Sequence, residues 1–144
     1  MRLTFRLFAL LALAVLFSHV RVCAAEIDAL LVTASKAPGP SDARLKPYEA
    51  TLRRILRFES FRLVGEGSAH LPAPGKGQIA LGGGHQLLLE IAGENSGRID
   101  ATWRHGKRVL MRTGLSLRPG GPAVLGGPET GRRGEVYAVI VVAK

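Results

Sequence analysis

Residues 78–117 have the sequence QIALGGGHQLLLEIAGENSGRIDATWRHGKRVLMRTGLSL. In this stretch the side chains at every second position are mostly apolar, and the segments are separated by turns rich in residues that reach positive φ. A period of two over consecutive segments predicts three or four antiparallel strands, in a meander with one buried and one solvent-exposed face. The buried phase comprises Ile79, Leu81, Leu87, Leu89, Ile91, Ile99, Ala101, Trp103, Val109, Met111, Thr113, Leu115 and Leu117.

Two runs near the ends of the chain are apolar on both faces. They cover residues 27–34 and 136–143, and such runs are typical of strands in the interior of a layered structure. We expect both strands to lie centrally, where they could pair side by side. The segment 68–75 should instead lie at an edge, because Pro72 and Pro74 cannot donate to an interior ladder.

One helix is predicted over about 45–57, and Pro47 sets its start because proline is tolerated only in the first turn. The apolar stripe of this helix comprises Tyr48, Leu52, Ile55 and Leu56, and its polar face carries Lys46, Glu49, Arg53, Arg54 and Arg57. A strand over 58–66 follows. This order is compatible with a right-handed crossover onto one sheet, or with a helix packed across one end of a sandwich. The predicted fold class is therefore α+β, mainly antiparallel β-sheet or a small β-sandwich with one amphipathic helix.

The first 24 residues are typical of a secretory signal peptide. Two arginines precede an apolar run over residues 7–17, which is shorter than the roughly 20 residues that a spanning helix needs. Small residues allow cleavage after Ala24 or Ala25. We therefore expect a protein exported to the periplasm or beyond the cell.

The single cysteine, Cys23, is expected to leave with the signal peptide, because its sequence context differs from a lipid-attachment site. Residues 25–144 would then form one exported β-rich domain without disulfide bonds and without a transmembrane span.

The chain is basic, with a formal net charge of +9, and about +6 remains once the three arginines of the signal segment are removed. Such a charge favours an acidic partner, for which we consider an envelope protein, anionic lipid or acidic polysaccharide. A nucleic-acid partner is disfavoured, because the basic residues of the meander lack exposed aromatic neighbours. The candidate contact residues are Arg53, Arg54, Arg57, Arg132 and Arg133.

No motif for catalysis, cofactor binding or metal binding is complete in the sequence. The residues around Ser68 do not form Gly-x-Ser-x-Gly, and the glycine runs do not open helices. The histidines lack His-x-His or His-x-x-x-His spacing. We therefore predict no catalytic, cofactor or metal residues. A small hydrolase is the alternative, and it requires Ser68, His70, His85 and acidic neighbours to converge in one pocket.

The segment LRPGGPAVLGG at 117–127, followed by the apolar strand 136–142, resembles the pore domain of secretins. In that family a glycine-containing turn leads into a short apolar strand and a Gly-Gly pair. The resemblance implies a periplasmic module associated with envelope secretion machinery. The rest of the chain lacks the tandem repeats of that family and is typical of a small exported bacterial protein. Our leading hypothesis is a non-catalytic binding or assembly module of the cell envelope.

Overall fold

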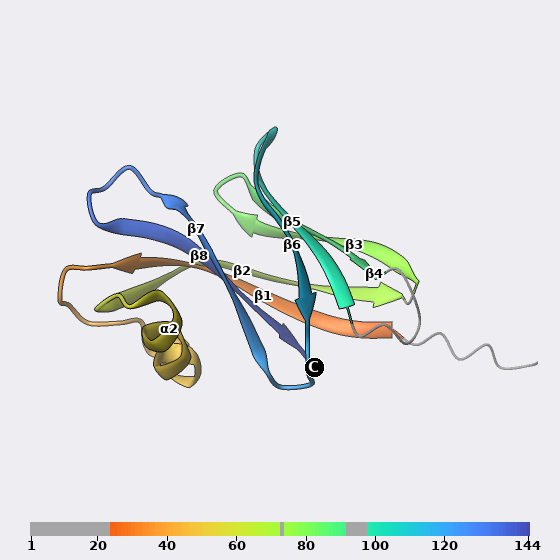
Figure 1. The fold of residues 1–144 in the computed structure, drawn as a ribbon, viewed down its shortest axis with the longest axis horizontal. Helices are drawn as coiled ribbons and strands as arrows, with labels where there is room; N and C mark the ends of the chain where they lie inside the picture. The colour runs from red at the N-terminus through yellow and green to blue at the C-terminus, as the bar shows by residue number, and fades with distance from the viewer. Residues whose placement is uncertain (1–23, 73, 92–97) are drawn as a thin grey trace, which may run out of the picture.

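The computed structural model describes residues 24–72, 74–91 and 98–144, which form two four-stranded antiparallel sheets (Figure 1). Residues 1–23 of the predicted signal peptide, Cys23 among them, lie outside the described residues, as do residue 73 and residues 92–97. In spatial order, the first sheet comprises β2 (Ser60–Pro72), β1 (Ala24–Ser35), β8 (Glu135–Ala143) and β7 (Pro122–Glu129). The second comprises β3 (Gly75–Gly82), β4 (His85–Ile91), β5 (Arg98–His105) and β6 (Arg108–Ser116). A 3-10 helix, η1 (Ala43–Tyr48), runs into the helix α2 (Glu49–Leu56). The predicted α+β class is confirmed.

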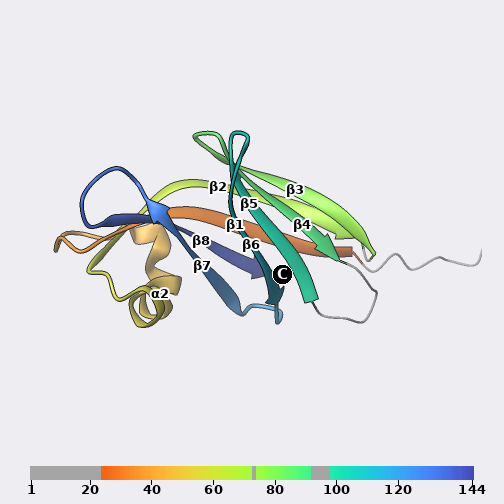
Figure 2. The same cartoon turned by 45° about the horizontal axis from the view of Figure 1, so that its top comes forward.

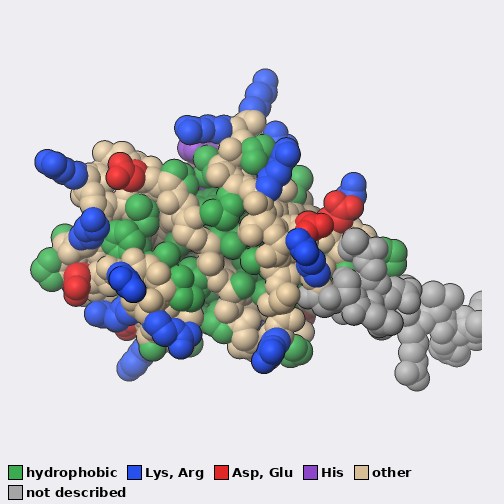
Figure 3. Space-filling view, viewed as in Figure 1, with side chains coloured by type: hydrophobic (Ala, Val, Ile, Leu, Met, Phe, Trp, Pro, Cys, Tyr) green, Lys and Arg blue, Asp and Glu red, His purple; other side chains and the backbone are tan. Residues whose placement is uncertain are grey.

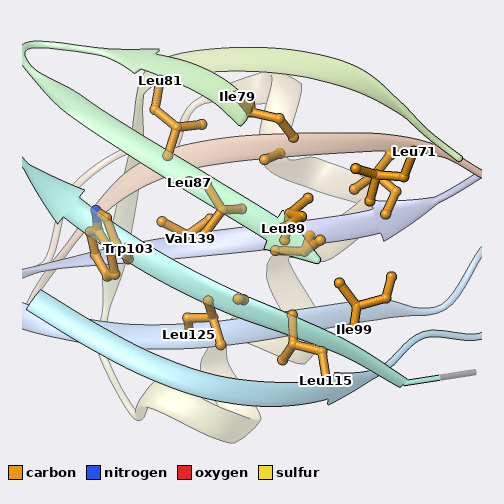
Figure 4. Close-up of a cluster of buried hydrophobic side chains, with 14 of the residues drawn as sticks. Leu71, Ile79, Leu81, Leu87, Leu89, Ile99, Trp103, Leu115, Leu125 and Val139 are labelled. Atoms are coloured by element: carbon orange, nitrogen blue, oxygen red, sulfur yellow. The ribbon is translucent and has the colours of Figure 1, made fainter. Parts of the chain in front are cut away.

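The second sheet is the predicted meander, because its four strands are neighbours in chain order. The alternating side chains of β3, β4 and β5 are buried as predicted, and they meet the first sheet in one apolar core (Figure 4). The prediction of burial is wrong for one of these side chains, because Val109 is 40% exposed. The register shifts opposite the step from Trp103 to Arg104, so that Trp103 faces Met111 while Arg104 faces Val109. Leu110 is thus the extra residue of β6, and this bulge turns Val109 away from the core.

The two strands that are apolar on both faces, β1 and β8, are neighbours in the middle of the first sheet. One face of this pair packs against the second sheet, and the opposite face packs against the helical segment. Figure 2 shows the resulting three layers, with α2 on the side away from the meander. The prediction that the two runs lie centrally is confirmed. The segment predicted at an edge, 68–75, lies at an edge as far as Pro72, but it continues the predicted strand 58–66 in one strand, β2.

The helical segment covers the outer face of the first sheet near one end (Figure 1). Of the two predicted arrangements, the right-handed crossover between parallel strands is wrong, because β1 and β2 are antiparallel neighbours. Leu45 and Leu52 are fully buried, whereas Ile55, which was predicted in the apolar stripe, is 50% exposed. Ile55 lies in the last turn of α2, just before the left-handed cap at Arg57, where it falls on the flank of the stripe centred on Leu52.

The edge strands of the two sheets, β2 and β3, lie close together along their length. A Cβ atom on Gly65 would overlap the carbonyl oxygen of Leu81 in β3. Glycine at this position therefore lets the backbone of β3 lie directly over β2, which closes the sandwich along this edge.

Candidate functional site

A polar cleft lies on the sandwich-facing side of the first sheet, where this sheet extends beyond the meander. Figures 1 and 2 both show the end of β1, β7 and β8 continuing past the β3–β4 and β5–β6 turns. The cleft has a volume of about 430 Å³. Its lining comprises Thr33, Arg62, Leu63, Val64, Thr130, Arg132, Glu135 and Tyr137. We call this set the polar cleft.

The floor of the cleft is a row of three side chains from three neighbouring strands. Thr33 of β1 is the register partner of Arg62 on β2 and of Tyr137 on β8. Thr33 and Tyr137 are in phase with Leu31 and Val139, which belong to the core between the sheets. The row therefore continues the inner face of the sandwich into solvent.

A β-bulge in β2 is what turns Arg62 toward this row. Leu31 pairs with Gly65 and Val32 pairs with Leu63, so Val64 is the extra residue. On the amino-terminal side of the bulge, Leu63 packs with the helical segment, and its neighbour Arg62 consequently faces the cleft. Bulges commonly re-aim side chains beside functional sites.

The wall opposite Val64 is the loop between β7 and β8. Thr130 Oγ1 donates a hydrogen bond of 2.8 Å to Glu135 Oε1 and accepts one of 3.3 Å from the backbone N–H of Arg132. The backbone N–H of Thr130 also donates to the carbonyl oxygen of Glu135 at 3.1 Å. Gly131 makes this tight turn possible, because its φ of 99° is one that glycine adopts most readily. The loop is thus held in place before any ligand arrives.

The cleft carries two positive groups and one negative group. Within the described residues, the guanidinium groups of Arg62 and Arg132 have neither an ion-pair nor a hydrogen-bond partner. Glu135 is the one carboxylate of the lining. An unpaired guanidinium offers a planar fork of donors that suits carboxylate, sulfate or phosphate oxygens.

A cluster of aromatic rings separates the cleft from the apolar core. The Nε1–H of Trp103 donates to Nδ1 of His85 at 3.1 Å, and the ring of His85 stacks on that of His105 with centroids 4.2 Å apart. His85 also contacts Tyr137, with ring centroids 4.7 Å apart. His85 is only 3% exposed, and burial lowers its pKa, helped by the nearby charge of His105. Its neutral form is therefore the one that fits this cluster.

The five candidate arginines lie at one end of the first sheet, although they come from two distant segments. Arg53, Arg54 and Arg57 belong to α2 and its carboxyl-terminal cap, and Arg132 and Arg133 belong to the β7–β8 loop. Backbone hydrogen bonds tie the intervening loops together at this end: Lys36 donates to Gly134, and Glu59 donates to Ser35. Figure 3 shows several Lys and Arg side chains over this end of the molecule.

Two of the five differ in their surroundings. Arg53 forms an ion pair of 2.9 Å with Glu49 one turn away, so its charge is partly compensated. Arg132 lines the polar cleft, whereas Arg133 does not. The set therefore contains an ion-paired helix residue, exposed cations and one cleft residue.

The residues required for a hydrolase do not converge. Ser68 lies in a groove of about 420 Å³ on the helix-facing side of the first sheet, together with Asp28, Arg44 and Glu66. His70 of β2 pairs with Glu26 of β1 and lies outside this groove, and His85 is buried in the other sheet. The prediction of one shared pocket is wrong.

The cations around the helix-facing groove are already paired. Asp42 and Arg44 form an ion pair of 3.0 Å, and Lys144 forms one of 2.9 Å with Asp28. Among the described residues no group of three or more His, Cys, Asp or Glu side chains is placed to hold a metal ion. The groove is therefore less suited than the polar cleft to binding an anion.

Sequence reasoning missed Arg62, Thr33 and Tyr137 as site residues. In the sequence these residues resemble ordinary strand positions, and only the bulge at Val64 and the pairing of three strands bring them together. The polar loop that contains Arg132 was the one part of the cleft that composition could indicate.

Comparison with known proteins gives no relative: no family model, no curated protein and no solved structure matches the chain. In the part of the chain that the structure describes, no helix combines the length and the apolar character needed to cross a membrane.

Proposed function

We propose that this chain is a non-catalytic binding module of the cell envelope, exported to the periplasm or beyond, that contacts its partner through the end of the first sheet. The observation that carries this proposal is the convergence of Arg53, Arg54, Arg57, Arg132 and Arg133 from two distant segments at this end. We call these five residues the arginine end.

The physical argument is that loops on a rigid scaffold carry contact residues at little cost to stability. The core of the sandwich and the layer beneath the helix are both apolar and need nothing from the arginine end. Concentrated positive charge on an exposed end speeds encounter with an acidic partner and selects against a basic one. The signal-like amino terminus and the resemblance to secretins support an envelope protein as that partner.

The test is capture of partners from solubilised envelopes with the full chain, tagged at its carboxyl terminus, at low and at moderate salt. A defined protein that survives moderate salt is expected, and it should be lost when all five residues of the arginine end become glutamine. The control variant removes the same charge elsewhere by changing five other residues to glutamine: Lys76, Lys107, Arg108, Arg112 and Arg118. Equal capture by both variants would refute a role for the arginine end.

A second candidate function is binding to anionic surfaces or polymers through the same arginines. The guanidinium of Arg132, unpaired among the described residues, favours it, since surface cations bind such partners by charge alone. Retention on anionic vesicles or on heparin should then fall steeply with salt. Recovery of only salt-sensitive anionic material, with no defined protein, would favour this function over the first.

A further inference from the structure

The polar cleft has the features of a built binding site for a small ligand. Its volume of about 430 Å³ lies within the range of roughly 300–1,000 Å³ that is usual for ligand pockets. Its floor is a rigid three-strand row, and its wall is a loop held by internal hydrogen bonds. We propose that the cleft binds one acidic sugar residue, a pyranose that carries a single carboxylate, such as a hexuronate unit.

The charge of the lining selects the number of negative charges on the ligand. The lining contains two guanidinium groups, those of Arg62 and Arg132, and one carboxylate, that of Glu135, so its net charge is +1. A monoanion neutralises this charge, whereas a phosphate dianion would leave a surplus of negative charge close to Glu135. The balance therefore favours a carboxylate ligand over a phosphate ester.

The remaining groups of the lining suit the hydroxyl groups of a sugar. Thr33 brings a side-chain hydroxyl that can donate and accept, whereas Thr130 Oγ1, whose hydrogen is donated to Glu135, can only accept. Glu135 can accept from a ligand hydroxyl while it also accepts from Thr130 Oγ1. Tyr137 and the half-exposed Val64 add apolar surface against which the C–H face of a pyranose can pack. A simple carboxylate such as acetate would leave most of these groups without a partner.

The site is also set up without the ligand. His85 packs against the ring of Tyr137 from the core side, and the β7–β8 loop is bonded to the start of β8. Little ordering is then required on binding, which lowers the entropic cost of holding a small, weakly bound sugar.

This inference deepens the second candidate function, binding to anionic polymers, and rests on it for the chemistry of the partner, an acidic polysaccharide, while it depends on Arg62, which lies outside the arginine end. The experiment is titration of the purified full chain with D-glucuronate, followed by isothermal calorimetry and by amide chemical shifts. Saturable binding with a Kd of about 1 mM or below is expected, with D-glucose and acetate each at least about tenfold weaker. Absence of saturation, or equal binding of acetate, would overturn the proposal.

Variants of the lining sharpen the test. Arg62→Gln and Arg132→Gln should each weaken D-glucuronate binding about tenfold or more, because each removes a charge-assisted hydrogen bond. The matched control is Arg133→Gln, which removes the same charge from the same loop but from outside the cleft. Equal losses in all three variants would mean that net charge alone binds the sugar, and the cleft would be rejected.

The charge balance has its own test. Inorganic phosphate should bind the unmodified chain more weakly than D-glucuronate at pH above about 7, and Glu135→Gln should strengthen phosphate binding relative to D-glucuronate. Tighter phosphate binding by the unmodified chain would overturn the choice of a monoanion. Failure of D-glucuronate to bind while the envelope partner is still captured would reject this inference alone. Loss of envelope capture in both five-residue glutamine variants, together with D-glucuronate binding by the unmodified chain, would reject only the role of the arginine end.

Discussion

At the scale of single residues, the contact between Trp103 and His85 connects the core to the cleft. Both side chains are almost fully buried, and the indole N–H has its acceptor on the imidazole Nδ1 at 3.1 Å. The neutral imidazole satisfies the indole, whereas the protonated ring has no acceptor on either nitrogen. Protonation of His85 would also place a charge beside the stacked ring of His105.

The protein should therefore lose stability as the pH falls below about 6.5, the ordinary pKa of histidine. Because the folded-state pKa of His85 is lowered, the unfolded chain binds its proton first, and stability is lost between the unfolded and the folded pKa. The slope from one such group is at most about 1.4 kcal/mol per pH unit. Urea unfolding at a series of pH values measures it.

Two variants test whether His85 causes this pH dependence of stability. His85→Gln should flatten the pH dependence, since the amide oxygen can accept from Trp103 without titrating. The exposed His70 is the control, and His70→Gln should leave the slope as it is. An unchanged slope in His85→Gln would show that another group is responsible.

At the scale of elements, the helical segment is attached to the first sheet by a narrow contact. Leu45 and Leu52 are fully buried against β1, β2 and β8, and Leu56 is partly buried. The predicted fourth contact, Ile55, projects half into solvent.

Leu52→Ala should lower the free energy of unfolding by about 2–5 kcal/mol, because it opens a cavity in a fully buried layer. Ile55→Ala removes a similar side chain from the same helix but should cost less than about 1 kcal/mol. Chemical denaturation of both variants measures the difference. A similar loss in both would mean that Ile55 is packed against the protein.

The close approach of β2 and β3 depends on a glycine at Gly65. Gly65→Ala should destabilise the fold by about 1–3 kcal/mol or more, because the neighbour that must move is the backbone carbonyl of Leu81. Gly39 has open space around it, so Gly39→Ala should change stability little. Thermal unfolding of the two variants tests the contact, and a neutral Gly65→Ala would show that the two strands are further apart.

At the scale of the whole molecule, the first and last strands of the described chain form the centre of the first sheet. β8 pairs with β1 on one side and with β7 on the other, and it contributes to both apolar layers. No other strand of the described residues could replace it without breaking the sheet into two pieces.

Deletion of residues 136–144 should therefore abolish cooperative folding, because it removes the central strand and exposes both layers. Deletion of Lys144 alone is the control: it removes an exposed ion pair with Asp28 and one backbone hydrogen bond to Glu26, and it should leave cooperative folding intact. Amide peak dispersion and the sharpness of thermal unfolding distinguish the two. A dispersed spectrum from the longer deletion would contradict this account.

Much of the architecture follows from local periodicity. The alternation in 78–117 was sufficient for the meander, the two-sided apolar runs were sufficient for the central position of β1 and β8, and Pro47 placed the start of the helix within a turn. Ile55 is misplaced because it lies on the flank of the helical stripe in the last turn of α2, and Val109 is misplaced because the strand period changes at a register shift. A pattern counted at one period cannot detect such a change.

The polar cleft, by contrast, was decided by tertiary structure alone. Its central row joins Arg62, Thr33 and Tyr137, which are far apart in the chain and become neighbours only when β2, β1 and β8 pair in one register. The phase of Arg62 further depends on the bulge at Val64, which shifts the side chains of β2 to the other face. Periodicity is a local property of the chain, so it specified which residues form strands and which faces are apolar. Register and bulges arise from contacts between distant segments, and they determined which polar side chains meet.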